Sequence, residues 1–199
     1  MGTRTEHDML GEMEIPADAW YGVQTQRALE NFSITGVPIS HFPELVKALA
    51  MVKLAAARTN CELGLLPERK AFAISAACQA ILEGRAHDQF VVDLIQGGAG
   101  TSTNMNANEV IANLALAVMG HNKGDYQHLH PNDDVNCSQS TNDAYPTAVC
   151  LSIQFAAEPL TERLKSLIQA FSEKGAQFSD VVKMGRTQLQ DAVPMTLGQ

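Results

Sequence analysis

Basic residues are scarce in this chain of 199 residues, where 14 lysines and arginines stand against 22 aspartates and glutamates. The formal net charge is −8, and the basic residues form no cluster. Such a chain is a poor candidate for binding the phosphate backbone of a nucleic acid. No apolar run reaches the roughly 18 to 20 residues that a membrane-spanning helix needs. We therefore expect no nucleic-acid partner and no insertion into a membrane.

Paired cysteine motifs and a leader segment are also lacking. The four cysteines, Cys61, Cys78, Cys137 and Cys150, form no C-x-x-C pair, which argues against a zinc knuckle and a disulfide framework. The first residues are polar and of mixed charge, unlike the apolar stretch of a signal peptide. Free thiols in a chain without a signal peptide predict a cytoplasmic protein.

Apolar residues recur at helical spacing along most of the chain, of which 45% is hydrophobic. Glycine and proline punctuate these stretches and predict helices over residues 43–63, 67–84, 104–119 and 143–183. We expect Pro159 to kink the last helix or divide it in two. Residues 1–40 carry turn signals and are predicted to be irregular. The sequence thus predicts an all-α fold.

A glycine-rich segment, residues 97–104, leads directly into the third predicted helix. Glycine lets the backbone approach a ligand closely, and a helix N-terminus offers unpaired N–H groups. The hydroxyls of Thr101, Ser102 and Thr103 add donors, so the segment suits a carboxylate or a phosphate. An ordinary glycine-rich helix start with Asn104 as N-cap is an equally good interpretation.

A second polar segment, residues 138–143, precedes the fourth predicted helix. Asn142 or Asp143 would serve as the N-cap, but capping does not require Ser140 and Thr141 as well. Two hydroxyl-rich helix starts favour a ligand with two anionic ends.

The third segment, residues 185–191, follows the long helix. Thr187 and Gln188 are neutral donors that suit a substrate. Arg186 is either a carboxylate clamp or a structural partner of Asp191, and the structural interpretation is preferred.

Metal-capable side chains gather in the loop before the second segment, at His128, His130, Asp133 and Asp134. In a loop this mixture is more often solvated or hydrogen bonded, so we expect no metal there.

Together, and in this order, the three segments resemble the aspartase/class II fumarase superfamily, and the resemblance covers essentially the whole chain. It is carried by residues 4–8, 10–11, 15–22, 24–28, 100–113, 130–136, 139–143 and 185–199. It implies an L-aspartase-like, mainly helical N-terminal lyase domain over residues 1–141. Residues 142–199 then begin a truncated central helical-bundle domain. It also implies a homotetramer whose active sites form where three subunits meet.

Within the superfamily, aspartases rather than fumarases are resembled by residues 97–102, 119–126 and 142–147 and by Gln188. The implied reaction is the reversible elimination of ammonia from L-aspartate to give fumarate, through an aci-carboxylate intermediate and without a cofactor. Whether a divalent cation activates it stays open. The implied substrate-binding residues are Thr101, Ser140, Thr141, Asn142, Thr187 and Gln188.

Two departures from the family accompany this resemblance. The family's catalytic serine lies in a Gly-Ser-Ser-x-Met-Pro-x-Lys-x-Asn loop that does not occur in these residues, and Cys137 stands where lysine is frequent. We therefore expect a fragment that carries part of the substrate site, no catalytic base and no activity alone. The alternatives are a class II fumarate hydratase and an inactive, truncated assembly or binding module.

Overall fold

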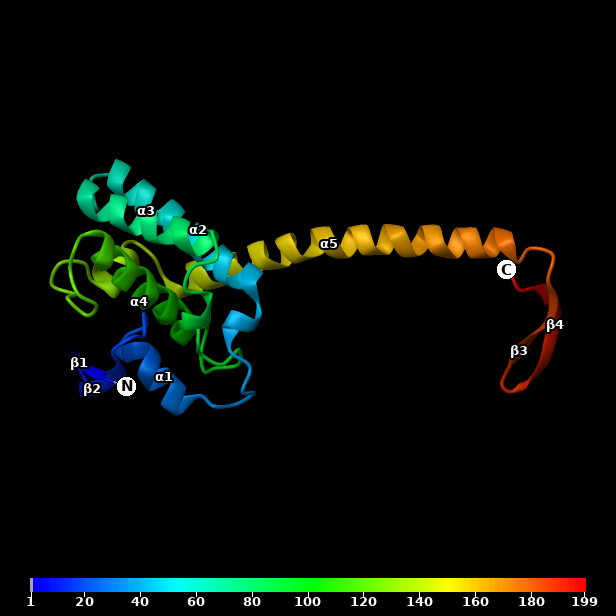
Figure 1. Cartoon of the computed structure of the whole chain (residues 1–199), viewed down its shortest axis with the longest axis horizontal. Coiled ribbons are helices and arrows are strands. Elements are labelled where there is room, and N and C mark those ends of the chain that lie inside the picture. The colour runs from blue at the N-terminus through cyan, green and yellow to red at the C-terminus, as the bar shows by residue number, and fades with distance from the viewer. Residues whose placement is uncertain (1) are drawn as a thin grey trace. The chain divides into compact units, whose positions relative to one another are not determined.

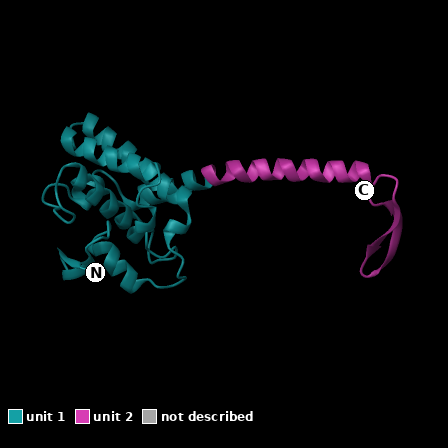
Figure 2. Ribbon diagram, in the orientation of Figure 1, with its two compact units in different colours: residues 1–153 teal, residues 154–199 magenta. Residues whose placement is uncertain are grey.

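The computed structural model describes residues 2–199, which divide into two compact units after Ile153 (Figure 2). The longest helix, α5 (Thr141–Gln177), begins in the first unit and continues into the second. Helices form the bulk of the described chain, which confirms the predicted fold class, with two antiparallel hairpins added to it.

The first unit is built around α4 (Thr101–Val118), of which nearly every residue from Thr103 to Leu116 is buried. It contacts α1, α2, α3 and the short π-helix η3, and α2 and α3 run side by side (Figure 1). The other elements of this unit are β1 (Thr3–Asp8), β2 (Gly11–Pro16), α1 (Val23–Asn31), η1 (Ile39–His41), α2 (Pro43–Glu62), α3 (Glu68–Leu82), η2 (His87–Gln89) and η3 (Pro131–Val135).

Small side chains let these helices pack closely. Alanines at fully buried positions face the apolar core, and larger side chains fill the space between them. The buried set includes Ala48, Ala73, Ala77, Ala112, Ala115, Val46, Leu49, Ile74, Ile111 and Leu116. The predicted helices over residues 43–63, 67–84 and 104–119 are confirmed to within a few residues.

The prediction that residues 1–40 are irregular was wrong. β1 and β2 form an antiparallel hairpin with Asp8 opposite Gly11, and α1 follows. The strands are short, polar and largely exposed, so they lack the alternation that marks a half-buried strand.

Helix α1 was missed because residues far away in the sequence cap it. Its N-cap is Gly22, which has no side chain to bond the first N–H groups. Instead, Glu109 of α4 accepts from the backbone N–H of Gly22 at 2.9 Å, Gln24 at 2.8 Å and Thr25 at 3.0 Å. Glu6 of β1 accepts from the N–H of Val23 at 3.0 Å. Burial raises the pKa of Glu109 to about 7, although these hydrogen bonds favour its ionised form.

Asp93 fixes the loop that follows α1. Its carboxylate accepts from the backbone N–H groups of Ile34, Thr35, Gly36 and Ile95, and from the Thr35 hydroxyl. Burial alone would raise the pKa of Asp93, but these bonds hold it well below its usual range. The loop is thereby tied to the segment that leads into α4.

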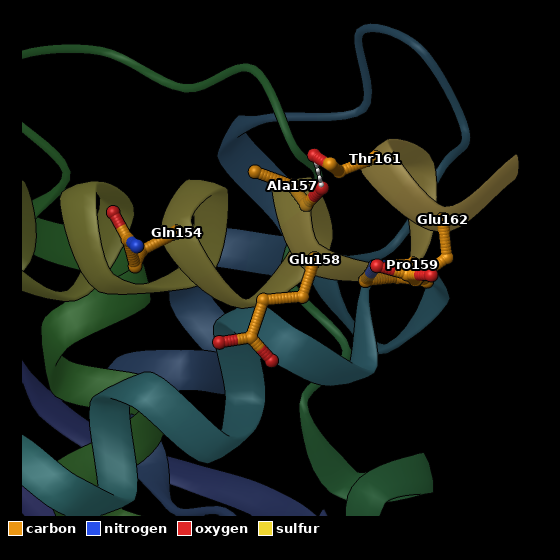
Figure 3. A pocket seen from close by; sticks show the side chains of 6 residues that line it. All are labelled: Gln154, Ala157, Glu158, Pro159, Thr161 and Glu162. Atoms are coloured by element: carbon orange, nitrogen blue, oxygen red, sulfur yellow. Dashed lines mark hydrogen bonds between the residues drawn. The ribbon is translucent and has the colours of Figure 1, made fainter. Parts of the chain in front are cut away.

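The expected division at Pro159 was wrong, because α5 continues through it as one helix. The helix ends at Gln177, six residues before the predicted end. Close by, the Thr161 hydroxyl donates to the Ala157 carbonyl oxygen at 2.8 Å (Figure 3). Beyond Ile153 the apolar stripe of α5 is exposed, with Leu160, Leu164 and Phe171 at 60%, 50% and 70% exposure.

After α5, the second unit holds a hairpin of β3 (Val182–Thr187) and β4 (Gln190–Thr196). Neither strand was predicted. The two-residue turn between them places both Gln188 and Leu189 in the left-handed region, at φ of 48° and 62°. Turns of this kind prefer asparagine and glycine, so Gln188 and Leu189 carry no hairpin signal.

Among residues 2–199, no helix is both long enough and apolar enough to cross a membrane.

Candidate functional site

The glycine-rich segment ends at Gly100, which is the N-cap of α4. Asn104 therefore lies inside the first turn, and the prediction that it caps the helix was wrong. Gly100 has a φ of 84°, and a Cβ there would lie 2.5 Å from ring atoms of Tyr145 on α5. Only glycine suits this position, because the backbone is left-handed and lies directly against the Tyr145 ring.

The three hydroxyls of this segment differ in their availability. Thr103 is buried, its backbone N–H donates to Gln96 Oε1 at 3.1 Å, and its hydroxyl accepts from Gln96 Nε2 at 2.5 Å. It therefore holds the loop rather than a ligand. Thr101 is exposed at the first position of α4, where a ligand would also meet unpaired N–H groups.

The second segment starts α5 with a serine cap. The Ser140 hydroxyl accepts from the backbone N–H of Asn142 at 3.2 Å, and the helix begins at Thr141. Neither Asn142 nor Asp143 is the cap, contrary to the prediction. Ser140 and Asn142 are exposed, and Thr141 is half-buried.

The fold brings the first two segments together. The Thr141 hydroxyl accepts from Asn104 Nδ2 at 3.3 Å, which joins the first turns of α4 and α5. A hollow of about 380 Å³ lies between the segments. It is lined by Leu94, Ile95, Gln96, Gly98, Ala99, Gly100, Asn142, Tyr145 and Pro146. Thr101 lines a second hollow, of about 520 Å³, with Gln24, Tyr126 and His130 among its other residues.

The third segment lies in the second unit, at the end of the β3–β4 hairpin. Thr187 and Gln188 are both exposed there. Arg186 Nε lies 3.1 Å from Asp191 Oδ1, also at the surface. The structural interpretation of Arg186 is thus confirmed.

A buried polar cluster behind the second segment escaped the sequence analysis. Lys53 of α2 is fully buried, and its ammonium donates to Asn136 Oδ1 at 2.8 Å. The same oxygen accepts from Asn104 Nδ2 at 3.0 Å and Asn108 Nδ2 at 3.3 Å. Burial lowers the pKa of Lys53 to about 7. The available signal was the place of Lys53 four residues after Leu49, on the apolar face of its helix.

The histidine loop forms η3 and is held by internal hydrogen bonds. His130 Nδ1 accepts from the backbone N–H groups of Asn132 and Asp133, each at 3.2 Å. Asp134 accepts from Lys70 Nζ and from the backbone N–H of His130, each at 2.7 Å. In the described part of the chain, no group of three or more His, Cys, Asp or Glu side chains is arranged to hold a metal ion.

The hollow in Figure 3, of about 550 Å³, does not suit an anionic ligand. Its lining comes from α5 alone and includes the carboxylates of Glu158 and Glu162. The hydroxyl of Thr161 is bonded to its own helix. The paired starts of α4 and α5 are therefore the better candidate site.

Comparisons with known proteins show what the chain as a whole resembles. A family model described as a lyase matches residues 11–199. The curated aspartate ammonia-lyase of Pseudomonas fluorescens is 67% identical over 196 residues, which cover 98% of this chain and 41% of that protein. The chain thus spans about two fifths of the curated relatives it matches.

Two solved structures share the fold. A fumarate lyase:delta crystallin from Brucella melitensis, in native form, has a TM-score of 0.94 and 60% identity, covering 98% of this chain and 44% of that one. A recombinant class II fumarase from Schistosoma mansoni has a TM-score of 0.88 and 38% identity, covering 99% and 41%.

Proposed function

The chain belongs to this lyase family, and we propose that it is the N-terminal part of an aspartate ammonia-lyase. The whole enzyme would reversibly eliminate ammonia from L-aspartate to give fumarate. The observation that carries the proposal is that Asn104 and Thr141 join the first turns of α4 and α5, beside a hollow lined by Gly100 and Asn142. The name shared by its curated relatives supports the same reaction.

The proposed chemistry explains why neutral donors are wanted. A base removes the proton from the carbon beside the β-carboxylate of aspartate, which generates an aci-carboxylate with two negative charges on its oxygens. Ammonia then leaves from the neighbouring carbon, and the double bond of fumarate forms. A preorganised hydrogen-bond donor aimed at such an oxygen lowers the barrier by about 3 kcal/mol. The substrate's own carboxylate is the electron sink, so the reaction requires no cofactor.

We assign substrate-holding roles to six residues. Thr101, Ser140, Thr141 and Asn142 would hold the amino group and one carboxylate, with the N-terminal N–H groups of α4 and α5 adding positive potential. In a site that forms where subunits meet, Thr187 and Gln188 of a neighbouring subunit would hold the other carboxylate. The base would come from a part of the whole protein outside these residues, so this chain alone is expected to be inactive.

We further propose a cytoplasmic homotetramer. The exposed apolar residues Leu160, Leu164 and Phe171 of α5 support assembly, since a stripe of this kind is normally covered by partner helices. All four cysteines are free in the described chain, which fits a reducing compartment. The N-terminal domain would end at residue 141 and the bundle domain begin at residue 142.

Substrate specificity tests this proposal directly. The complete enzyme is offered L-aspartate or L-malate, and the ultraviolet absorbance of fumarate is followed. We expect fumarate from aspartate. Fumarate from malate alone would instead identify a fumarate hydratase, the reaction suggested by the name of the Schistosoma mansoni relative.

Two substitutions test where the substrate lies. Thr101→Val or Thr187→Val in the complete enzyme should lower turnover by about tenfold to a thousandfold, with little loss of folding. Thr59→Val is the matched control, because Thr59 is exposed on α2 and has no proposed role. Unchanged kinetics in both site variants would show that the substrate lies elsewhere.

A further inference from the structure

A chain of hydrogen bonds runs from the buried ammonium of Lys53 to the hydroxyl of Thr141. Lys53 Nζ donates to Asn136 Oδ1 at 2.8 Å. Asn104 Nδ2 donates to that same oxygen at 3.0 Å and to Thr141 Oγ1 at 3.3 Å. The chain thus connects the interior of α2 to the first residue of α5, where the candidate site lies.

Lys53 and the Gln139 carbonyl together fix the direction in which these hydrogen bonds are donated. An ammonium group has donors and no acceptor, so Asn136 must present its oxygen to Lys53. The amide nitrogen of Asn136 then faces the other way and donates to the Gln139 carbonyl oxygen at 3.0 Å. Because Asn136 Oδ1 is an acceptor, both Asn104 and Asn108 turn their NH₂ groups toward it.

This arrangement is unfavourable for the asparagines themselves. Asn104 Oδ1 and Asn108 Oδ1 are buried and have no hydrogen-bond partner among residues 2–199. An unpaired buried acceptor destabilises a fold, and so does a buried ammonium. The nearby thiol of Cys78 on α3 does not compensate the charge, because burial raises its pKa to about 12 and keeps it neutral. Stability therefore does not account for this cluster.

The orientation of Asn104 determines what the Thr141 hydroxyl can do. Since Thr141 Oγ1 accepts from Asn104 Nδ2, its own proton remains free to be donated to a carboxylate. With the Asn104 amide reversed, its oxygen would accept that proton and compete with the ligand.

We propose that Lys53 is a positioning residue: through Asn136 and Asn104, it keeps the Thr141 hydroxyl as a donor toward a substrate carboxylate. This inference rests on the proposed function, because it takes Thr141 to hold the substrate. Lys53 itself is fully buried and acts only through the two asparagines.

A double-mutant cycle in the complete enzyme tests this role. Lys53→Met removes the first donor in the series of hydrogen bonds, and Asn104→Ala removes the one that reaches Thr141. Either variant alone therefore carries the test if the other fails to fold. Each is made alone and together with Thr141→Val. The measurements are kcat and KM for aspartate and the Kd for succinate, a dicarboxylate that lacks the reacting amino group.

We expect Lys53→Met and Asn104→Ala each to raise KM and the succinate Kd by about tenfold, with a smaller change in kcat. In the Thr141→Val background the same substitutions should change both constants by less than about twofold, because the hydroxyl they act on is gone. Asn108→Ala is the matched control, since Asn108 also donates to Asn136 Oδ1 but has no bond to Thr141. It should leave both constants within about twofold of the parent enzyme.

The outcomes separate this inference from the proposed function. A parent enzyme that binds succinate but forms no fumarate from aspartate would refute the ammonia-lyase reaction, while the succinate cycle would still decide the role of Lys53. Equal effects of Lys53→Met with and without the Thr141 hydroxyl, or no effect at all, would overturn the positioning role.

Discussion

Replacing Lys53 by methionine should stabilise the protein at pH 7, even though the change removes a hydrogen bond. The ammonium of Lys53 is fully buried, and it donates a hydrogen bond to the neutral amide oxygen of Asn136. Methionine has a similar length and carries no charge to desolvate.

The size of the expected stabilisation follows from the pKa of Lys53 in the unfolded chain and in the folded chain. Burial lowers the pKa from 10.5 to about 7, and at about 1.4 kcal/mol per unit this corresponds to at most about 5 kcal/mol of folding free energy. The lost charge-assisted hydrogen bond offsets about 1.5–3 kcal/mol of that gain. We therefore expect the variant to be more stable at pH 7 by about 2 kcal/mol.

The pH dependence of stability independently checks whether Lys53→Met stabilises the protein. Between pH 7 and pH 10.5 the unfolded chain binds more protons at Lys53 than the folded chain does, so wild-type stability rises with pH in this window. Methionine does not titrate. The advantage of the variant should therefore shrink as the pH rises and should be reversed near pH 10.5.

Thermal unfolding of both proteins from pH 6 to pH 10.5 measures this difference. For a chain of this size, about 2 kcal/mol corresponds to a rise in melting temperature of about 4–8 °C at pH 7. Lys47→Met, at a half-buried position of the same helix, should change stability by less than about 0.5 kcal/mol. A variant that melts below wild type at pH 7, or a difference independent of pH, would refute the reasoning.

Three further substitutions test other parts of the structure. Gly100→Ala adds a Cβ 2.5 Å from the Tyr145 ring at a left-handed φ, so it should weaken succinate binding at least about tenfold in calorimetry. Asp93→Asn should lower the melting temperature at pH 7, because the depressed pKa of Asp93 stabilises the folded chain above the unfolded pKa of 3.8. The difference from wild type should shrink as the pH falls below 3.8. Leu189→Gly should relieve the left-handed turn by about 1 kcal/mol, seen as an about fivefold slower amide exchange in β3 and β4.

The sequence was most informative where a structural rule acts locally. Apolar spacing identified α2, α3 and α4, because each buries a continuous face. The β3–β4 hairpin was missed because Gln188 and Leu189 occupy a turn that normally needs asparagine or glycine. The expectation that Pro159 divides the helix was wrong, since α5 continues from Thr141 to Gln177 as one helix.

At the candidate site, the sequence indicated which hydroxyls lie at helix starts but not which side chains support them. Thr101, Ser140 and Thr141 carry hydroxyls at helix starts, a pattern visible in the letters alone. The link from Lys53 to Thr141 depends on four segments that meet only in the folded chain. Thr103 is buried and its hydroxyl accepts from Gln96, which is likewise a property of the folded chain.

The capping of α1 by Glu109 has a consequence for the order in which this chain folds. Gly22 and Glu109 are 87 residues apart, so the first turn of α1 gains its partners only after α4 has been brought beside it. Closing so long a loop lowers the conformational entropy of the chain, a cost that a helix with local caps does not have. Helix α1 is therefore a late-forming element, and its amides should gain protection together with the docking of α4 rather than ahead of it.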